Sequence, residues 1–413
     1  MNMQEERTNV PKIRFKGYAE EWEERKLRDI TERVRGNDGR MDLPTLTISA
    51  SSGWLDQRDR FSGNIAGKEQ KNYTLLKKGQ LSYNHGNSKL AKYGAVFELT
   101  TYDEALVPRV YHSFDTNELA SSNFIEYMFA TKRPDRELAK LVSSGARMDG
   151  LLNINFDEFM GINVSVPSVG EQQKIGTFFK QLDDTIALHQ RKLDLLKETK
   201  KGFLQKMFPK NGAKVPEIRF PGFTEDWEER KVFEISKVTY GGGTPKTNTK
   251  EFWNGNIPWI QSSDLEINRL FNISPKKKIT SEAVKKSAAK IIPPNSIAIV
   301  TRVGVGKLAL MPFEYATSQD FLSLSELQID SYFGIFSLYS MLQKELKNIQ
   351  GTSIKGMTKS DLLEKKVTIP KKYEEQQKIG NFFKQLDDTI ALHQHELDSL
   401  KEMKKSLLQQ MFV

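Results

Sequence analysis

Two stretches of the chain carry residue types that could bind phosphate or transfer protons, and neither has the spacing that this chemistry needs. Gly304, Gly306 and Lys307 lie in a Gly-Val-Gly-Lys run without the four-residue gap of a phosphate-binding loop, and leucine follows the lysine where such a loop has Ser or Thr. Asp135 and Glu137 are too close in sequence for a pair of nuclease carboxylates and indicate a solvated helix face. Both stretches therefore fit structural roles better than catalytic ones.

Cofactor signatures are missing as well. Pro293 and Pro294 are followed by Asn295, which does not complete the box of an amino-methyltransferase, and no Gly-x-Gly-x-x-Gly run follows a predicted strand. The run Gly-Gly-Gly-Thr-Pro at residues 241–245 indicates a turn, although three glycines would allow a backbone to approach a ligand closely. We therefore expect no cofactor, no metal site and no catalytic activity in this chain.

Polar loops provide the remaining chemistry, because their side chains suit nucleic acid. Asn and Gln can bond adenine edges, Arg and Lys guanine edges, and Ser or Thr either phosphate or base. The predicted contacts in the first half are Ser51, Trp54, Gln57, Tyr83, Asn84, His85, Asn87, Lys89, Lys92 and Arg147. Those in the second half are Thr244, Lys246, Gln261, Ser262, Ser263, Arg302, Lys307, Gln319, Lys355 and Lys359.

A long internal repeat must position these loops. Residues 171–208 return as residues 375–412 with about four positions in five identical, which indicates a duplication. Apolar residues recur in alternating steps of four and three, which is typical of a coiled-coil seam. About 33 residues at 1.5 Å each make a helix of about 50 Å, and packing the two copies together, antiparallel, would bury both stripes. The predicted seam residues are Ile175, Phe179, Leu182, Ile186, Leu193, Leu196, Phe203, Ile379, Phe383, Leu386, Ile390, Leu397, Leu400 and Leu407.

The duplication includes a leading segment before each half, at residues 10–31 and 215–236, which share the letters WEERK. We expect Trp22 and Trp227 to anchor these segments by packing. Between segment and long helix, both halves mix strands with one helix, near residues 122–131 and 331–346, and end on a strand closed by proline, at residues 162–167 and 366–370. The sequence thus predicts an α+β fold with two similar globular domains and an internal pseudo-two-fold repeat.

The predicted boundaries follow from this order. They are a tail at residues 1–9, a first domain at 10–169, a long helix at 170–208, a connector at 209–214, a second domain at 215–373 and a second long helix at 374–413. The net charge of +9 suits a polyanion but does not by itself identify one. No run of 18 apolar residues is present, and zero cysteines fit a reducing cytoplasm, so we expect a cytoplasmic protein without a membrane partner.

Taken together, the chain resembles the specificity subunit of type I restriction–modification systems. The resemblance rests on the paired helices (EQQKIG and FFKQLDDTIALH twice), on the paired WEERK segments and on residues 241–265 and 301–310, and it covers nearly the whole chain. It implies two target-recognition domains that read the halves of an interrupted double-stranded DNA site. Because the two bodies differ in sequence, the target should be asymmetric.

The resemblance also implies partners. Two methyltransferase subunits would dock on the helices and two motor–nuclease restriction subunits would join them, so that S-adenosylmethionine, ATP and magnesium would bind in those partners and not in this chain. Base contacts do not carry over by position, because recognition loops differ between members. Two alternatives remain open from the residues alone: a coiled-coil adaptor that binds proteins without DNA specificity, and a divergent nuclease.

Overall fold

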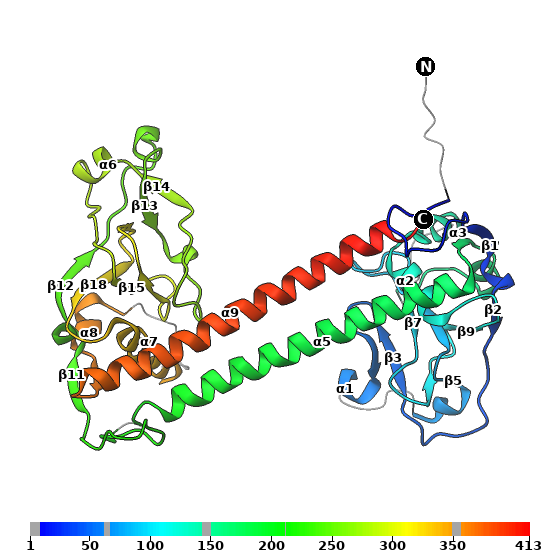
Figure 1. The fold of residues 1–413 in the computed structure, drawn as a ribbon, viewed down its shortest axis with the longest axis horizontal. Coiled ribbons are helices and arrows are strands. Elements are labelled where there is room, and N and C mark those ends of the chain that lie inside the picture. The colour runs from blue at the N-terminus through cyan, green and yellow to red at the C-terminus, as the bar shows by residue number, and fades with distance from the viewer. Residues whose placement is uncertain (1–8, 62–66, 143–149, 211, 349–356) are drawn as a thin grey trace. The chain divides into compact units, whose positions relative to one another are not determined.

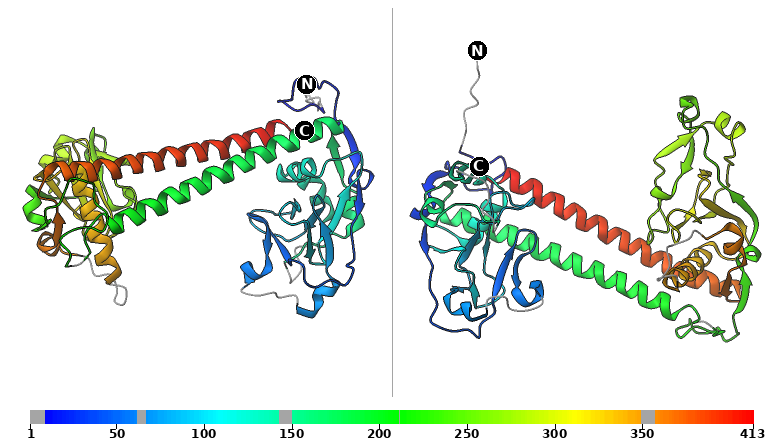
Figure 2. Two further views of the ribbon diagram at one scale, coloured as in Figure 1. Left: turned by 60° about the horizontal axis from the view of Figure 1, so that its bottom comes forward. Right: turned by 180° about the vertical axis from the view of Figure 1, so that it is seen from behind.

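Two 38-residue helices, α5 (Val169–Lys206) and α9 (Tyr373–Gln410), run side by side in the computed structural model (Figures 1 and 2). The structure describes residues 9–61, 67–142, 150–210, 212–348 and 357–413. Each helix begins and ends two residues earlier than the repeat predicts, because Phe208 and Phe412 leave the helix to pack into a core. The two predicted long helices are thus confirmed.

The chain divides into a first unit, Met1–Gln190 with His395–Val413, and a second unit, Arg191–Gln394. Each long helix therefore contributes to both units. Within each unit, residue numbers rise along α5 as they fall along α9, so the helices are antiparallel, as predicted. The bonded pairs that show this order are Asp183–Lys404 and Gln190–Lys401 in the first unit, and Lys200–Asp387 and Lys197–Gln394 in the second.

The first unit is α+β. Its strands are β1 (Glu23–Lys26), β2 (Thr31–Arg33), β3 (Leu46–Ser49), β4 (Gly53–Asp56), β5 (Thr74–Lys77), β6 (Leu81–Asn84), β7 (Ala95–Glu98), β8 (Glu104–Val107), β9 (His112–Thr116) and β10 (Asn163–Val166). Its helices besides α5 and α9 are α1 (Gln57–Phe61), α2 (Ser122–Ala130), α3 (Asp135–Leu141) and α4 (Phe156–Met160).

The second unit has the same class of fold. Its strands are β11 (Glu228–Lys231), β12 (Ser236–Gly241), β13 (Ile257–Ile260), β14 (Lys277–Ile279), β15 (Ser296–Val300), β16 (Leu308–Met311), β17 (Ala316–Thr317), β18 (Phe321–Leu327) and β19 (Lys366–Ile369). Its helices besides α5 and α9 are α6 (Ser281–Lys285), α7 (Ser331–Asn348) and α8 (Lys359–Glu364).

One four-stranded sheet recurs in both units. The strand order is β2-β9-β6-β7 in the first and β12-β18-β15-β16 in the second, with antiparallel neighbours throughout. Each unit also pairs its WEERK strand with the strand before its long helix, β1 with β10 and β11 with β19. The β6–β7 hairpin is therefore the topological equivalent of the β15–β16 hairpin.

The main core of each unit closes around a tryptophan from the leading segment and a phenylalanine from the end of a long helix. Trp22 packs edge-on against Phe412, with ring centroids 6.0 Å apart, and Trp227 packs against Phe208 at 6.3 Å. Both indoles are buried, which confirms their predicted anchoring role. The leading segment of the first unit therefore packs on the end of α9, not on the end of α5.

Burial along the long helices varies with position. Ile175, Phe179, Leu182, Leu193, Ile379, Phe383 and Leu397 are buried, whereas Ile186, Leu196, Phe203, Leu386, Ile390, Leu400 and Leu407 are half-buried. The start of α5 packs on α2 and on the segment that follows α9, because the Phe179 ring lies 5.3 Å from Tyr127 of α2 and 6.0 Å from Phe412. Within the described part of the chain, no helix combines the length and apolar character that crossing a membrane requires.

Candidate nucleic-acid interface

The loop of the β6–β7 hairpin carries three exposed residues of the predicted interface, Asn87, Lys89 and Lys92. Gly94 ends this loop with φ +86°, and a Cβ at this position would lie 2.5 Å from the Asn84 carbonyl oxygen. Only glycine avoids that overlap, so the turn is sharp and brings the loop back directly to the sheet. The loop offers two ammonium groups and one amide to a polyanion.

Two predicted contacts on the same unit are buried instead. The Tyr83 hydroxyl donates to the carbonyl of Tyr93 at 2.6 Å, and its ring stacks on Phe159 with centroids 4.2 Å apart. Gln57, at the start of α1, is 1% exposed. Neither side chain has surface for a base to contact, so we exclude both from the interface. The Tyr83 hydroxyl serves the fold, which the residue type alone could not reveal.

His85 links two loops within the first unit. Its Nδ1 lies 2.7 Å from the carbonyl oxygen of Leu152 and its Nε2 lies 3.0 Å from that of Val110. Because carbonyl oxygens only accept hydrogen bonds, the ring nitrogen that carries the hydrogen is the donor in its contact. The His85 ring stacks on the ring of His112, with centroids 4.9 Å apart. Burial lowers the pKa of His112 to about 4, so the His112 ring is neutral at neutral pH. The predicted role of His85 as a DNA contact is therefore replaced by a structural one.

Three other predicted residues of the first unit lie near the hairpin or on β3–β4. Trp54 is half-buried and donates from Nε1 to the carbonyl of Glu98 at 3.1 Å, while Asn84 accepts from the Gly86 N–H at 3.0 Å. Ser51 is exposed at the β3–β4 turn. Of the three, Ser51 is the most exposed, and its hydroxyl bonds those of Ser49 and Ser52 at 3.1 Å.

In the second unit the structure brings a group of charged side chains together beside the β15–β16 hairpin. Burial lowers the pKa of Lys359, the nearby Arg302 and Lys290 cations lower it further, and Asp320 opposes them. Lys307 donates to the Ser262 carbonyl at 3.0 Å, which ties the hairpin loop to the segment after β13. A cluster with more cations than anions favours a phosphate or another anionic partner.

The three glycines at the end of β12 serve the fold. A Cβ on Gly242 would lie 1.9 Å from the Ser318 carbonyl oxygen, and one on Gly243 would lie 2.3 Å from the Ala288 carbonyl carbon. Other segments of the same chain therefore lie directly against the backbone of Gly242 and Gly243. The glycines therefore allow packing of β12 against neighbouring segments rather than the approach of a ligand.

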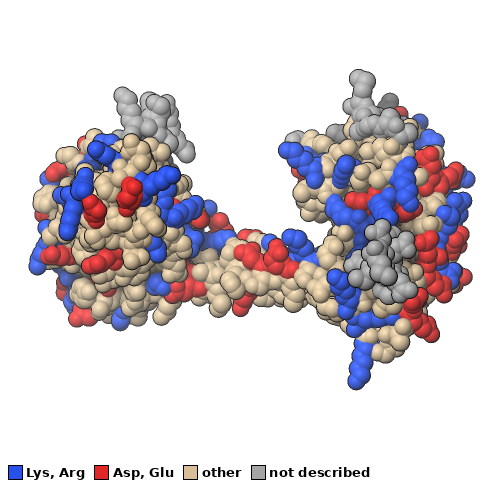
Figure 3. Space-filling model, turned by 90° about the horizontal axis from the view of Figure 1, so that it is seen from above, with Lys and Arg blue, Asp and Glu red and all other residues tan. Residues whose placement is uncertain are grey.

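The other predicted residues of the second unit lie on its surface or outside the described residues. Thr244, Lys246, Ser263 and Gln319 are exposed, and Gln261 is half-buried with its backbone N–H donating to Asp264 at 3.0 Å. Arg147 and Lys355 lie outside the described residues. Figure 3 shows Lys and Arg side chains among acidic ones on the surface of both units.

Two basic residues near the hairpins were missed from the sequence. Lys132 has φ 65° just after α2, and its ammonium contacts the carbonyl of Leu90 in the β6–β7 loop. Lys290 lies within electrostatic range of Lys359. Lys132 is distant from the β6–β7 loop along the chain, and Lys290 precedes β15, so it is the fold that shows which groups they lie beside.

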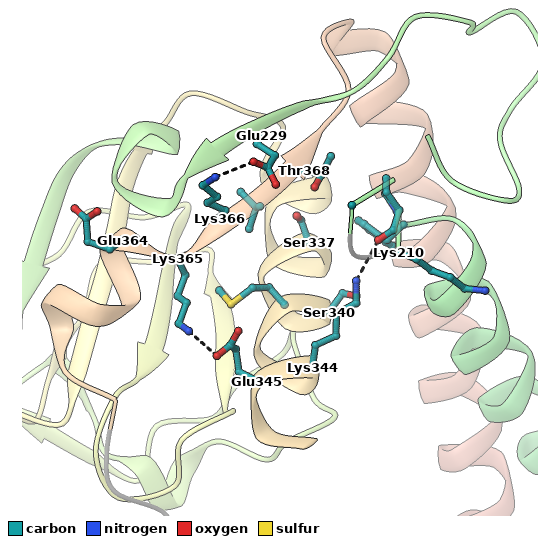
Figure 4. Close-up of a pocket in the computed structure, with 15 residues that line it drawn as sticks. Lys210, Glu229, Ser337, Ser340, Lys344, Glu345, Glu364, Lys365, Lys366 and Thr368 are labelled. Atoms are coloured by element: carbon teal, nitrogen blue, oxygen red, sulfur yellow. Dashed lines mark hydrogen bonds and ion pairs between the residues drawn. The ribbon is translucent and has the colours of Figure 1, made fainter. Parts of the chain in front are cut away.

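A cavity of about 430 Å³ lies in the second unit between α7, β19 and the end of α5 (Figure 4). Lys365 pairs with Glu345 at 2.6 Å, Lys366 pairs with Glu229 at 2.9 Å, and the Lys344 ammonium donates to the Pro209 carbonyl at 3.1 Å. Its lysines therefore hold the walls of the cavity together. They do not converge on a common point as the groups of an active site do.

The long helices also expose apolar residues. Leu188 on α5 and Leu392 on α9 occupy the same position of the repeat and are 59% and 57% exposed, and Leu195 is exposed as well. Side chains of this kind at matching positions in both copies indicate a surface that is used twice.

Comparisons with known proteins agree with the duplicated plan. The family model described as "Type I restriction modification DNA specificity domain" matches residues 19–198 and, a second time, residues 224–402. Two relatives come from Methanocaldococcus jannaschii. The type I restriction enzyme MjaIX specificity subunit is 31% identical over 193 residues, which are 46% of this chain and 44% of that subunit. The putative MjaX specificity subunit is 22% identical over 97% of this chain and 95% of its own length.

Two solved structures have a similar fold. The S subunit of a type I restriction–modification system from M. genitalium has a TM-score of 0.62 at 13% identity, with 98% of this chain and 99% of that chain covered. A chain from a structural study of type I complex assembly has a TM-score of 0.53 at 14% identity, with 95% and 97% covered. At these identities the likeness supports the fold. The match to the MjaIX subunit spans less than half of that protein's length.

Proposed function

Because this chain belongs to the family of type I restriction–modification DNA specificity subunits, we propose that it reads an asymmetric, interrupted target on double-stranded DNA through two different domains. The proposed target-recognition domains are residues 10–169 and 215–373, and the helices at 170–208 and 374–413, with the connector at 209–214, join them. Catalysis then belongs to partner subunits, as membership in this family implies.

The observation that carries this proposal is the recurrence of one sheet with unlike loops. The β6–β7 and β15–β16 hairpins occupy equivalent places in the four-stranded sheets of the two units. Both present exposed basic side chains, which are Lys89 and Lys92 in the first and Arg302 in the second. Phosphate contacts fix a reader on the duplex, and loop residues that differ read different bases. Equal scaffolds with different loops therefore favour two half-sites of different sequence.

We further propose the partners and their cofactors. Two methyltransferase subunits dock on the long helices, where Leu188 and Leu392 repeat an exposed apolar position, and two restriction subunits join the assembly. S-adenosylmethionine, ATP and magnesium then bind in those subunits. The assembly works in the cytoplasm, where its DNA is.

Mapping of methylated adenines in a genome that carries this chain with its methyltransferase tests the proposal. We expect one interrupted motif with two different halves. Exchange of residues 32–168 for those of a relative should change one half of the motif and leave the other intact. A complex that binds mixed duplexes without sequence preference would instead identify the chain as a protein-binding adaptor. Cleavage of a plasmid by the purified chain with magnesium would identify a nuclease.

A further inference from the structure

The two equivalent hairpin loops share a feature that the predicted interface did not include. Leu90 in the β6–β7 loop is 63% exposed, and Val303 in the β15–β16 loop is 72% exposed. An aliphatic side chain loses free energy by facing water, and single exposed ones are common. Here, however, an exposed aliphatic side chain occurs in each of two equivalent hairpin loops, whose sequences are otherwise unlike.

The backbone around Leu90 is held from both sides. Ala91, the next residue, is buried; its N–H donates to Ser88 Oγ at 3.1 Å and its carbonyl accepts from the Ser88 N–H at 3.1 Å. The carbonyl of Leu90 itself contacts the Lys132 ammonium. The loop thus forms a fixed turn that presents the Leu90 side chain outward. A side chain presented in this way is positioned before any partner binds.

The loop around Val303 is fixed by different means. The N–H of Thr301 donates to the Asp320 carbonyl at 2.7 Å, and the N–H of Val300 donates to the Lys307 carbonyl at 2.9 Å. Gly304 and Gly306 have φ +93° and +99°, and a Cβ on Gly306 would lie 2.4 Å from Leu346. The tight turn that these glycines allow projects Val303 away from the sheet.

Cations flank both aliphatic side chains. Lys89 and Lys92 lie on either side of Leu90 in the chain and are exposed. Arg302 directly precedes Val303 and is exposed. Lys359 lies within electrostatic range of Arg302. An exposed apolar side chain between two cations matches a DNA duplex better than it matches an apolar protein or lipid surface. In a duplex, the phosphates can bind the cations while the stacked bases contact the apolar side chain. Proteins that bend DNA insert apolar side chains between base steps in this way.

We propose that Leu90 and Val303 are the base-contacting wedges of the two domains, each pressed against or between bases of its own half-site while the neighbouring cations bind phosphates. This inference rests on the proposed function, because it assigns specificity-determining residues for the same DNA interface. The wedge discriminates through the stacking of the base step that it opens, and pyrimidine–purine steps open most easily. Sequence preference then comes from the apolar tip and affinity from the cations.

The test uses the full chain assembled with its methyltransferase partner and a duplex that carries the mapped target. Leu90→Ala and Leu90→Gln should each weaken binding of the specific duplex by about tenfold to a hundredfold and leave binding of a scrambled duplex unchanged. The slope of log affinity against log salt should stay the same, because no phosphate contact is lost. Val303→Ala should do the same for the other half-site.

Two matched comparisons separate the wedge from its surroundings. Lys89→Gln or Lys92→Gln should weaken specific and scrambled duplexes alike and reduce the salt slope by about one for each lost phosphate contact. Met41→Ala and Ile267→Ala, which shorten exposed apolar side chains elsewhere on the two units, should leave both affinities unchanged. The thermal transition of every variant is measured, and we expect it unchanged because Leu90 and Val303 contribute little to the cores.

A fluorescence measurement supplies the direct readout. 2-Aminopurine at half-site positions other than the methylated adenine should brighten when the wild-type complex binds, because unstacking relieves its quenching, and should stay dim with Leu90→Ala. If the wild type prefers its target but the Leu90 and Val303 variants keep both the preference and the fluorescence change, the wedge assignment is wrong. If the wild type shows no preference at all, the proposed function itself is wrong.

Discussion

Lys404 on α9 donates to Asp183 on α5 at 2.7 Å, and the same pair recurs 204 residues away as Lys200 and Asp387 at 2.5 Å. Each lysine also lies over an aromatic ring of its unit's core helix, Lys404 over Tyr127 at 5.3 Å and Lys200 over Phe336 at 5.4 Å. The two lysines occupy the same position of the repeat, so charge pairs as well as apolar side chains join the two long helices. The two pairs differ in burial, which makes them a natural comparison.

Replacing each lysine by methionine should expose that difference in burial. The Lys404–Asp183 side chains are 23% and 39% exposed, and the Tyr127 hydroxyl also donates to Asp183, so Lys404→Met should lower the free energy of unfolding by about 0.5–1 kcal/mol. The Lys200–Asp387 side chains are 12% and 16% exposed, so Lys200→Met should cost about 1–3 kcal/mol. Urea titration of each variant gives the two values, with Lys401→Met as a surface control. Equal losses would contradict the argument.

The buried carboxyl group of Glu126 should make the free energy of unfolding depend on pH. Burial raises its pKa from 4.5 to about 7, and the Glu98 backbone N–H donates to its carboxylate at 3.1 Å. A carboxyl whose pKa is raised by folding binds its proton more tightly in the folded state, so this contribution is present below pH 4.5 and is lost as pH rises to about 7. Glu126→Gln, which keeps an acceptor for the Glu98 N–H, should therefore be more stable than the wild type at pH 8 by about 1–2 kcal/mol.

The same two proteins should have similar stability at pH 4.5, where Glu126 is protonated in the folded state. The free energy of unfolding is measured by urea titration from pH 4.5 to 8. A gap between the proteins that stays constant over this range would show that burial does not disfavour the charged form of Glu126.

Gly380 should be far less replaceable than other glycines of the long helices. A Cβ at Gly380 in α9 would lie 2.5 Å from the backbone nitrogen of Phe333, which cannot move without shifting α7. Gly380→Ala should therefore cost about 1–3 kcal/mol in spite of the better helix propensity of alanine. At Gly176, its counterpart in α5, the nearest atoms to a Cβ belong to the side chain of Asn123, which can move more easily than backbone, so Gly176→Ala should cost less.

Gly202 in α5 provides the control, because a Cβ there meets nothing within 4 Å. Gly202→Ala should stabilise the protein by about 0.5–1 kcal/mol through helix propensity alone. Thermal melts rank the three alanine variants. A Gly380→Ala protein that melts with or above Gly202→Ala would disprove the close contact of α9 with α7.

The sequence predicts the long helices well because their signal is local and is repeated. Ile175, Phe179 and their counterparts Ile379 and Phe383 recur in a period that only a helix satisfies, and all four are buried. The repeat also identifies both leading segments. Which helix end each segment packs on could not be predicted, because Trp22 and Phe412 meet only in the folded chain.

The binding loops are predicted less well, because polar residue types do not distinguish a ligand contact from an internal hydrogen bond. His85 and Tyr83 look like ligands for bases in the sequence, yet the carbonyls of Leu152 and Tyr93, which lie elsewhere in the chain, bond their polar atoms. Conversely, a search for polar groups passes over Leu90, whose exposure depends on the turn that presents it. Burial and exposure are tertiary properties, and they decide which side chains are free to bind.

Two arginine–glutamate pairs with buried carboxylates allow the last prediction. Arg14 bonds Glu171 through two contacts of 2.7 Å, and Arg219 bonds Glu375 at 2.7 and 2.9 Å, so each pair ties a leading segment to the start of a long helix. Glu171 is 0% and Glu375 1% exposed. Replacing either glutamate by glutamine leaves a partly buried guanidinium without its counter-charge, and we expect a loss of about 1–3 kcal/mol for each.

The pairs are not equal, however, and the difference predicts which variant suffers more. Trp227 donates from Nε1 to Glu375 at 3.2 Å, whereas Nε1 of Trp22 has no hydrogen-bond partner among the residues that the structure describes. Glu375→Gln weakens three charge-assisted bonds and Glu171→Gln two, so Glu375→Gln should destabilise its unit more. Hydrogen exchange of the amides in each unit measures the losses separately. Equal losses would mean that the indole bond adds nothing, and a larger loss in Glu171→Gln would reverse the argument.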